Sequence, residues 1–435
     1  MHPIDESQLF RKISVRILPV LMLAFFFSYV NRVNIGFAKL QMASDLHFSD
    51  AVYGLGAGIF FIGYFVLEVP SNIILHRIGA RRWIARIMLS WGVISCATIF
   101  VRTPMQFYAM RLLLGLAEAG FIPGAIYYMS QWYPAARRSR AWGVFYIALA
   151  SSGMVGGLMS GAILRFMTGL GGLRGWQWLI LCEGLPTLLT GVYILLRMDD
   201  NIAGVTWLSD DEKRHLRTVL ANENRDKIET GIGALLFDSR IWILTAIYFT
   251  FTMGLYAISF WMPTLVQRMG VHDALTIGVL SAIPCACAIV SMVAMGYSAG
   301  RRNDRRWHLT AAYAMAAVGF ALCVLWQRNP ALGVFALCIA NMGVFSIPAL
   351  FWGLPTAMLT GVAAAAGIAI INSVANLAGF IAPSLIGYLS TMTGRTDIAL
   401  IVVGAGLVVG ALLVLWITRE RQLAAQPDGR RLHEM

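Results

Sequence analysis

The sequence predicts an all-α membrane protein of about twelve transmembrane helices, arranged as two pseudo-symmetric six-helix bundles. Its 435 residues are 58% hydrophobic and only 13% charged, with a mean hydropathy of +0.69. A soluble domain of this length needs more charge to cover its surface. Apolar runs of about 20 residues, each long enough to cross a bilayer, recur from end to end. These runs do not alternate with period two, which excludes a β-barrel.

Each span is expected where an apolar run lies between polar connections or glycine and proline punctuation. The expected spans lie near 14–38, 52–76, 83–101, 105–130, 141–165, 176–197, 239–265, 274–298, 307–326, 331–353, 361–390 and 397–418. The boundary between the tenth and eleventh spans rests on Gly353, Pro355 and Gly361, because no charged loop separates them.

One long polar stretch divides the chain near its middle. We therefore predict an N-terminal six-helix bundle over 1–197, a linker over 198–238, and a C-terminal six-helix bundle with a polar tail over 239–435. Within the linker, Ser209 and Glu212 have the spacing of a capping box. The residues around them predict a short amphipathic helix that lies on the membrane surface.

The pattern R-x-x-x-R-R-W occurs twice and supports the division into halves. It begins at Arg77 and again at Arg301, in each half after the second span and before the third. Repeated halves around a midplane site are the usual plan of secondary transporters.

The basic residues behind the formal net charge of +12 are distributed as membrane topology predicts, so this charge does not indicate nucleic-acid binding. Basic clusters fall on alternate connections between the spans, and such connections stay in the cytoplasm. This places both termini of a multi-pass protein on the cytoplasmic side of the inner membrane. The six cysteines lie within apolar runs and predict neither disulfides nor a metal site.

A few ionisable residues lie inside the apolar runs. Such a group costs roughly 2.5–3.5 kcal/mol to insert, so it usually faces a partner or a wet cavity and marks a route for solutes. Arg32 can bind a carboxylate bidentately and is the expected anion-binding group, with a structural ion pair as the alternative. Glu118 shares a helix face with Arg111 and is expected to carry the coupled proton, with a permanent salt bridge as the alternative.

Other polar residues complete a predicted pocket. Tyr64 and Glu68 project from one helix face, and we expect Tyr64 to bind substrate and Glu68 to pair with a basic residue in a gate. Asn372 and Asn376 also share a face and can bind hydroxyl or carboxylate groups, with interhelical hydrogen bonds as the alternative. Trp352 is a weaker candidate for the pocket, and Glu183 is expected to have a structural partner.

Five stretches resemble the major facilitator superfamily, and within it the anion:cation symporter branch. They are Tyr29–Ala38, Phe61–Asn72, Arg111–Gly124, Gly254–Pro263 and Ala366–Asn376, in order along the chain. The resemblance implies the major facilitator fold, a monomer, and uptake of tartrate-like, phthalate-like or sugar-acid substrates with protons. It also implies that Tyr256 lines the substrate pocket and that Trp261 lies near the cavity, with an anchor at the membrane interface as the alternative for Trp261. We expect Glu68, Arg77, Arg111 and Arg301 to be gating or structural charges.

Two departures from that branch affect these expectations. Asn31 stands where relatives commonly have an aspartate that is a proton-coupling candidate, so coupling would rest on Glu118 or another carboxylate. His76 replaces an acid that the superfamily expects in the connection after the second span. The contacts of one gate are therefore expected to be weakened or made differently.

The sequence thus predicts a secondary transporter that imports a small hydroxylated carboxylate by proton symport with alternating access. Its partners would be the organic anion, protons and the bilayer, with no cofactor and no catalytic or metal site. An uncoupled facilitator or an exporter of organic or aromatic acids is the main alternative, and a non-transporting nutrient sensor is another. A membrane-embedded enzyme is disfavoured, because no paired catalytic motif is present.

Overall fold

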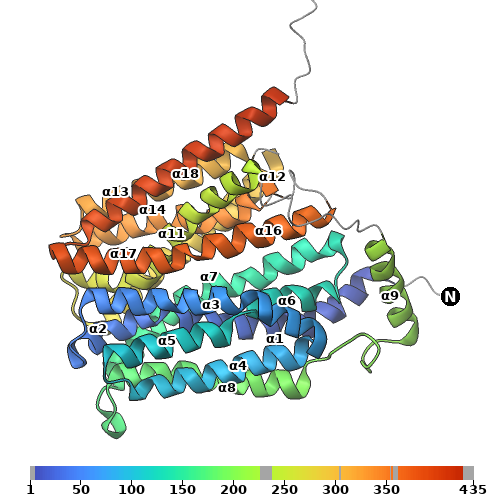
Figure 1. Cartoon of the computed structure of the whole chain (residues 1–435), viewed down its shortest axis with the longest axis horizontal. Helices are drawn as coiled ribbons and strands as arrows, with labels where there is room; N and C mark the ends of the chain where they lie inside the picture. The colour runs from blue at the N-terminus through green and yellow to red at the C-terminus, as the bar shows by residue number, and fades with distance from the viewer. Residues whose placement is uncertain (1–4, 226–237, 303–304, 353, 356–360, 425–435) are drawn as a thin grey trace, which may run out of the picture.

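The computed structural model describes residues 5–225, 238–302, 305–352, 354–355 and 361–424. Within these ranges the regular structure is helical, and twelve segments are long and apolar enough to cross a membrane (Figure 1). The predicted fold class is confirmed.

The N-terminal half supplies six of these segments, of which the first and the fourth are each built from two α-helices. Its elements are α1 Glu6–Val33, α2 Ile35–Asp45, α3 Asp50–Ile78, α4 Ala80–Ala97, η1 Thr98–Phe100, α5 Pro104–Glu118, α6 Phe121–Ser130, α7 Ala135–Phe166, η2 Leu170–Gly172 and α8 Gly175–Arg197. Local chemistry sets several of the helix starts. For example, the Thr103 hydroxyl and the Gln106 side chain form a capping box at α5, where Pro104 occupies the first turn.

The C-terminal half supplies the other six segments. Its helices are α11 Ser239–Arg268, α12 Ala274–Arg302, α13 Arg306–Leu325, α14 Pro330–Phe351, α16 Gly361–Asn376, α17 Ala378–Thr393 and α18 Asp397–Ala424. The predicted division between the tenth and eleventh spans falls partly on residues 353 and 356–360, which lie outside the described residues.

The linker contains the short helix α9, Asp210–Arg225, which packs on the N-terminal half. The expected capping box is present, because Ser209 and Glu212 exchange hydrogen bonds of 3.2 and 2.8 Å. Trp207 stacks on Trp132 with ring centroids 5.7 Å apart. We call the end of the bundle that carries α9 and the start of α1 the α9 face (Figure 1).

The two halves meet along two helix pairs that the internal repeat relates. Helix α3 packs on α17, and α7 packs on α12. Glycines allow both approaches: a Cβ on Gly54 would lie 2.3 Å from the Pro383 carbonyl oxygen, and one on Gly278 would lie 2.5 Å from the Gly157 carbonyl oxygen. Small residues at these helix crossings let the two backbones come into direct contact.

The hydrogen bonds between the halves are concentrated toward the face opposite α9. Tyr53 donates to the Phe260 carbonyl over 2.8 Å, and Asp50 accepts from Arg268 over 2.7 Å. Toward the α9 face the ribbons of α1 and α18 lie progressively farther apart (Figure 1). The structure is therefore closed at the face opposite α9.

Three membrane-spanning segments contain a break between two α-helices in the described part of the chain. The first breaks at Asn34 between α1 and α2, the fourth at Ala119 and Gly120 between α5 and α6, and the eleventh at Leu377 between α16 and α17. Gly120 has φ of +88°, a conformation that favours glycine. Backbone freed at a break needs other partners, and Ser71 donates to the Ala119 carbonyl over 2.7 Å.

Candidate functional site

The interruptions of the first and fourth segments bring together the central charged pair. Arg32 lies in the last turn of α1, and Glu118 is the last residue of α5. An Arg32 Nη2 group donates to Glu118 Oε1 in a salt bridge, and Ser28 Oγ donates to the same oxygen over 3.1 Å. Only 9% of Arg32 and 1% of Glu118 is exposed, so the pair is sheltered from solvent.

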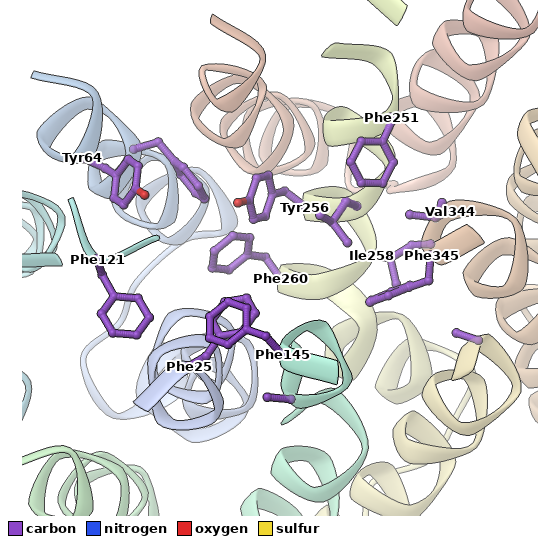
Figure 2. Packing of buried hydrophobic residues seen from close by; sticks show 14 of the residues in the cluster. Phe25, Tyr64, Phe121, Phe145, Phe251, Tyr256, Ile258, Phe260, Val344 and Phe345 are labelled. Atoms are coloured by element: carbon purple, nitrogen blue, oxygen red, sulfur yellow. The ribbon is translucent and has the colours of Figure 1, made fainter. Parts of the chain in front are cut away.

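The C-terminal half reaches this pair through Tyr256 on α11. The Arg32 Nη1 group donates to the Tyr256 hydroxyl over 3.2 Å. Figure 2 shows the hydroxyl groups of Tyr64 and Tyr256 turned toward each other from α3 and α11. Arg32 is thus held by groups from both halves, at the junction on which an alternating-access movement would act.

Aromatic rings surround the guanidinium. The Arg32 Cζ atom lies 5.3 Å from the ring centroid of Phe60 and 5.4 Å from that of Tyr64. A cation over an aromatic face is stabilised by the ring quadrupole, and more so where water is excluded. Phe25 and Phe145 stack with centroids 4.6 Å apart and continue the apolar wall (Figure 2).

Two polar atoms of the central pair have no hydrogen-bond partner among the described residues. They are Nε of Arg32 and Oε2 of Glu118, and both are buried. Buried polar groups are normally satisfied, and an unsatisfied one needs an explanation. An unused donor and an unused acceptor in one buried ion pair are suited to a ligand that carries both a carboxylate and a hydroxyl group.

The sequence profile of the Major Facilitator Superfamily matches residues 21–366. The chain belongs to this family. Its members are membrane transporters, so this major facilitator protein is a multi-pass transporter and not an enzyme, as predicted.

Relatives of known name cover almost the whole major facilitator chain. A Pseudomonas putida protein named as metabolite transport protein NicT is 41% identical, over 94% of each chain. An Agrobacterium vitis protein named as a tartrate transporter is 42% identical, over 95% of each. An Acinetobacter baumannii protein named as a quinolone resistance transporter is 38% identical, over 96% of this chain and 97% of its own.

A solved structure agrees on the fold. A bacterial homologue of the human lysosomal transporter Spinster, in an inward-facing and occupied conformation, superposes with a TM-score of 0.75 at 15% identity. The match covers 93% of this chain and 96% of that one. The predicted major facilitator fold and superfamily are confirmed.

Several predicted pocket residues lie away from the central pair. Trp352 follows the end of α14, with its ring centroid 4.8 Å from that of Tyr248. Asn372 and Asn376 lie half-buried on α16, and no hydrogen bond among the described residues joins either of them to Arg32. Whether they bind substrate stays a prediction.

The gating charges differ in their surroundings. Glu68 accepts a 3.0 Å hydrogen bond from Ser373 Oγ, a hydroxyl of the other half. No salt bridge joins Glu68 to a basic residue in the described part of the chain, and its expected pairing stays a prediction. Arg77 and Arg301 are exposed at the α9 face and make no ion pair with a described residue.

Arg111 is buried, with carbonyl partners in place of a carboxylate. Its Nε and Nη2 groups donate to the carbonyl oxygens of Gly56 and Ala57 over 3.3 and 3.4 Å. The Arg111 Cζ atom lies 5.0 Å from the Phe60 ring centroid. The residue therefore joins α5 to α3 and places a second positive charge beside the Phe60 ring.

Sequence reasoning missed Ser28 and Phe60 as members of the site. Ser28 stands four residues before Arg32, so helical spacing on the Arg32 face was the available signal. Phe60 stands four residues before Tyr64 on α3 in the same way, but an apolar ring in an apolar run carries no distinguishing mark.

Proposed function

We propose that the protein imports a small hydroxylated carboxylate, such as tartrate or a sugar acid, together with protons. The observation that carries this proposal is the buried Arg32–Glu118 pair, which both halves contact and which keeps an unused donor and acceptor. The name of the Agrobacterium vitis relative supports a tartrate-like substrate.

Competition for one guanidinium supplies the coupling. While Glu118 is ionised, its carboxylate occupies Arg32 and excludes a second anion. Protonation of Glu118 removes that charge, and the buried Arg32 then needs a new anion because an unpaired buried charge is costly. A substrate carboxylate provides it, so proton and anion bind together.

The Tyr256 hydroxyl and the rings of Tyr64 and Phe60 complete this pocket, and Asn372, Asn376 and Trp352 on the C-terminal half are proposed to close over the substrate. Rocking of one half against the other then exposes the site to each side in turn. Glu68, Arg77, Arg111 and Arg301 are proposed to act as gating or structural charges.

The orientation follows from charge. Basic residues near Arg11, Arg77, Arg137 and Arg301 belong to the connections and helix ends at the α9 face, and such connections stay in the cytoplasm. We place the α9 face and both termini on the cytoplasmic side of the inner membrane. The structure is then closed to the outside, and we take the functional unit to be a monomer.

Uptake of radiolabelled L-tartrate into proteoliposomes tests the proposal. Uptake should rise with an inward-directed pH gradient, and Glu118→Gln should strongly reduce accumulation while retaining tartrate exchange. Gradient-independent uptake by the native protein would remove the symport step, and absence of tartrate, tartrate-like and sugar-acid uptake would remove the substrate class.

A second candidate is export of an organic or aromatic acid. The quinolone name of the Acinetobacter baumannii relative and the uncharged Asn31 favour it. Inside-out vesicles energised by a pH gradient, acidic inside, distinguish the two candidates. An exporter accumulates an aromatic acid such as nalidixate in these vesicles, whereas the importer does not.

A further inference from the structure

Glu183 on α8 is a buried carboxyl whose only side-chain partner among the described residues is neutral. Only 3% of the residue is exposed, and one carboxyl oxygen accepts from the Asn34 amide. No ion pair with a described cation is present. The expected structural partner therefore exists, but it is an amide and not a positive charge.

A small polar chamber inside the N-terminal bundle adjoins this carboxyl. Its volume is about 20 Å³, room for about one water molecule. Its polar lining consists of Asn31, Asn34, Ser95, Thr98, Arg111 and Glu183. Glu183 and Arg111 thus line the same chamber, and neither forms a salt bridge with a described residue.

The other charged or titratable groups around Glu183 do not supply a counter-ion. On α4 the Cys96 thiol would lie 2.6 Å from a Cβ added to Gly184, and Cys182 neighbours Glu183 on α8 itself. The remaining described candidates on α2 and α7 are engaged elsewhere: Lys39 with Asp50, Asp45 with Trp176, Arg137 with Glu6, Arg138 with the Tyr133 carbonyl, Arg165 with Asp273, and Tyr146 with Phe25. Helix α1 and η1 line the chamber with the Asn31 amide and the Thr98 hydroxyl, and Arg32 of α1 is paired with Glu118.

A buried ionised carboxylate without a positive partner is strongly disfavoured, so Glu183 holds a proton while Asn34 is its partner. If it loses that proton, Arg111 is the one cation that lines the chamber and can stabilise it. The chamber therefore permits two arrangements: neutral Glu183 on Asn34, and ionised Glu183 facing Arg111 directly or through one water molecule.

The Glu183 partner lies at the interruption of the first segment. Asn34 separates α1 from α2, two residues after Arg32. Asn31 fastens the same turn to α8 and α4: its amide donates to the Glu183 carbonyl and the Thr187 hydroxyl over 3.1 and 3.0 Å, and it accepts from Ser95 over 2.6 Å. Loss of the hydrogen bond between Asn34 and Glu183 would loosen the turn that positions the Arg32 side chain.

We propose that Glu183 is a second proton-binding residue of the transport cycle, which positions Arg32 through Asn34. A proton enters the chamber from water, binds the Glu183 carboxylate and leaves to water on the other side of the membrane. No covalent bond other than the O–H bond forms or breaks. This inference rests on the proposed symport and adds one proton to it.

The inference is tested with full-length protein in proteoliposomes, with the membrane potential held at zero. The measured quantity is the slope of the logarithm of the L-tartrate accumulation ratio against the pH difference across the membrane. Each coupled proton contributes about tenfold accumulation per pH unit. With Glu118 and Glu183 both coupled, the native protein should show a change of about hundredfold per unit, and Glu183→Gln about tenfold. Glu183→Asp should keep the steeper slope, and Thr190→Val on the same helix should behave as native.

The failures are distinguishable. A native slope of zero overturns the proposed symport itself. A native slope of about tenfold, or an equal slope in the native protein and Glu183→Gln, overturns only the role of Glu183.

Infrared difference spectroscopy covers the case in which Glu183→Gln does not transport. The native protein at neutral pH should show the stretch of a protonated carboxyl that Glu183→Gln lacks and Glu118→Gln keeps, and alkaline titration should remove it. A stretch that Glu183→Gln retains, or one that no pH removes, contradicts an exchanging proton at Glu183.

Discussion

The carboxylate of Asp50 on α3 lies 2.7 Å from the guanidinium of Arg268 on α11 and joins the two halves at the face opposite α9. The Lys39 ammonium lies 2.7 Å from the same carboxylate and 3.8 Å from the Trp261 ring centroid. We call the cluster of Asp50, Lys39 and Arg268 the latch. Trp261, expected either near the cavity or at the membrane interface, is fully buried beside it. Movement that opens this face must separate Asp50 from Arg268.

Asp50→Asn should shift the protein toward opening at this face. Arg268 is about one-third exposed, so the pair contributes at most about 1 kcal/mol and the open population should rise about fivefold or less. Spin labels at Arg102 and Arg328, in a cysteine-free background, report the distance across the face. Arg395→Gln breaks a pair with Asp397 within one half and serves as the control; an equal shift in both variants would contradict the latch.

Gly387→Ala should hinder closure between α3 and α17. A Cβ at Gly387 would lie 2.3 Å from the Asp50 carbonyl oxygen, a backbone atom that cannot rotate away. We expect tartrate uptake to fall strongly while the folded yield in detergent is maintained, because each half keeps its own core. Gly406→Ala, where a Cβ meets nothing within 4 Å, is the matched substitution and should transport normally.

Tyr256→Phe should weaken substrate binding more than it weakens the fold. The lost hydroxyl is a 3.2 Å partner of Arg32, and a hydrogen bond to a charged group contributes about 1.5–3 kcal/mol. The KM for tartrate exchange should rise by about tenfold or more. Tyr388→Phe, on an exposed part of α17, is the comparison; an unchanged KM in Tyr256→Phe would place the substrate elsewhere.

Acid should loosen α9 from the N-terminal half. Burial raises the pKa of Glu212, but the Lys12 ammonium 2.7 Å away and the Ser209 amide outweigh it, so this pKa lies below its ordinary value of 4.5. A lowered pKa stabilises docking above pH 4.5, and the contribution is lost as pH falls through the pKa of the folded state.

Hydrogen exchange over residues 207–220 measures this loosening. Because the pair is partly exposed, the acid-dependent change should be about fivefold or less. Glu212→Gln should remove the pH dependence in this window, whereas Asp211→Asn, which loses a surface pair with Arg214, should preserve it. Identical profiles in the native protein and Glu212→Gln would exclude Glu212 as the acid-sensitive group.

Local patterns were sufficient to predict the helices and much of the central site. A 20-residue apolar run has few alternatives to a membrane-spanning helix, because its backbone must be hydrogen-bonded internally. The same reasoning singled out Arg32 and Glu118, since a charge in such a run is too costly to be incidental. The capping box at Ser209 followed from spacing alone.

What the sequence by itself determined is therefore the fold class, the repeated halves and the few charges that the bilayer would otherwise exclude. The tertiary structure decided how those charges are shared: Arg32 with Glu118, Glu68 with a hydroxyl of the other half, and Glu183 with Asn34. It also decided that the first, fourth and eleventh segments are interrupted. The physical reason is that pairing depends on which helix faces approach across hundreds of residues, and each approach is set by the combined packing of many side chains that spacing along one helix does not encode.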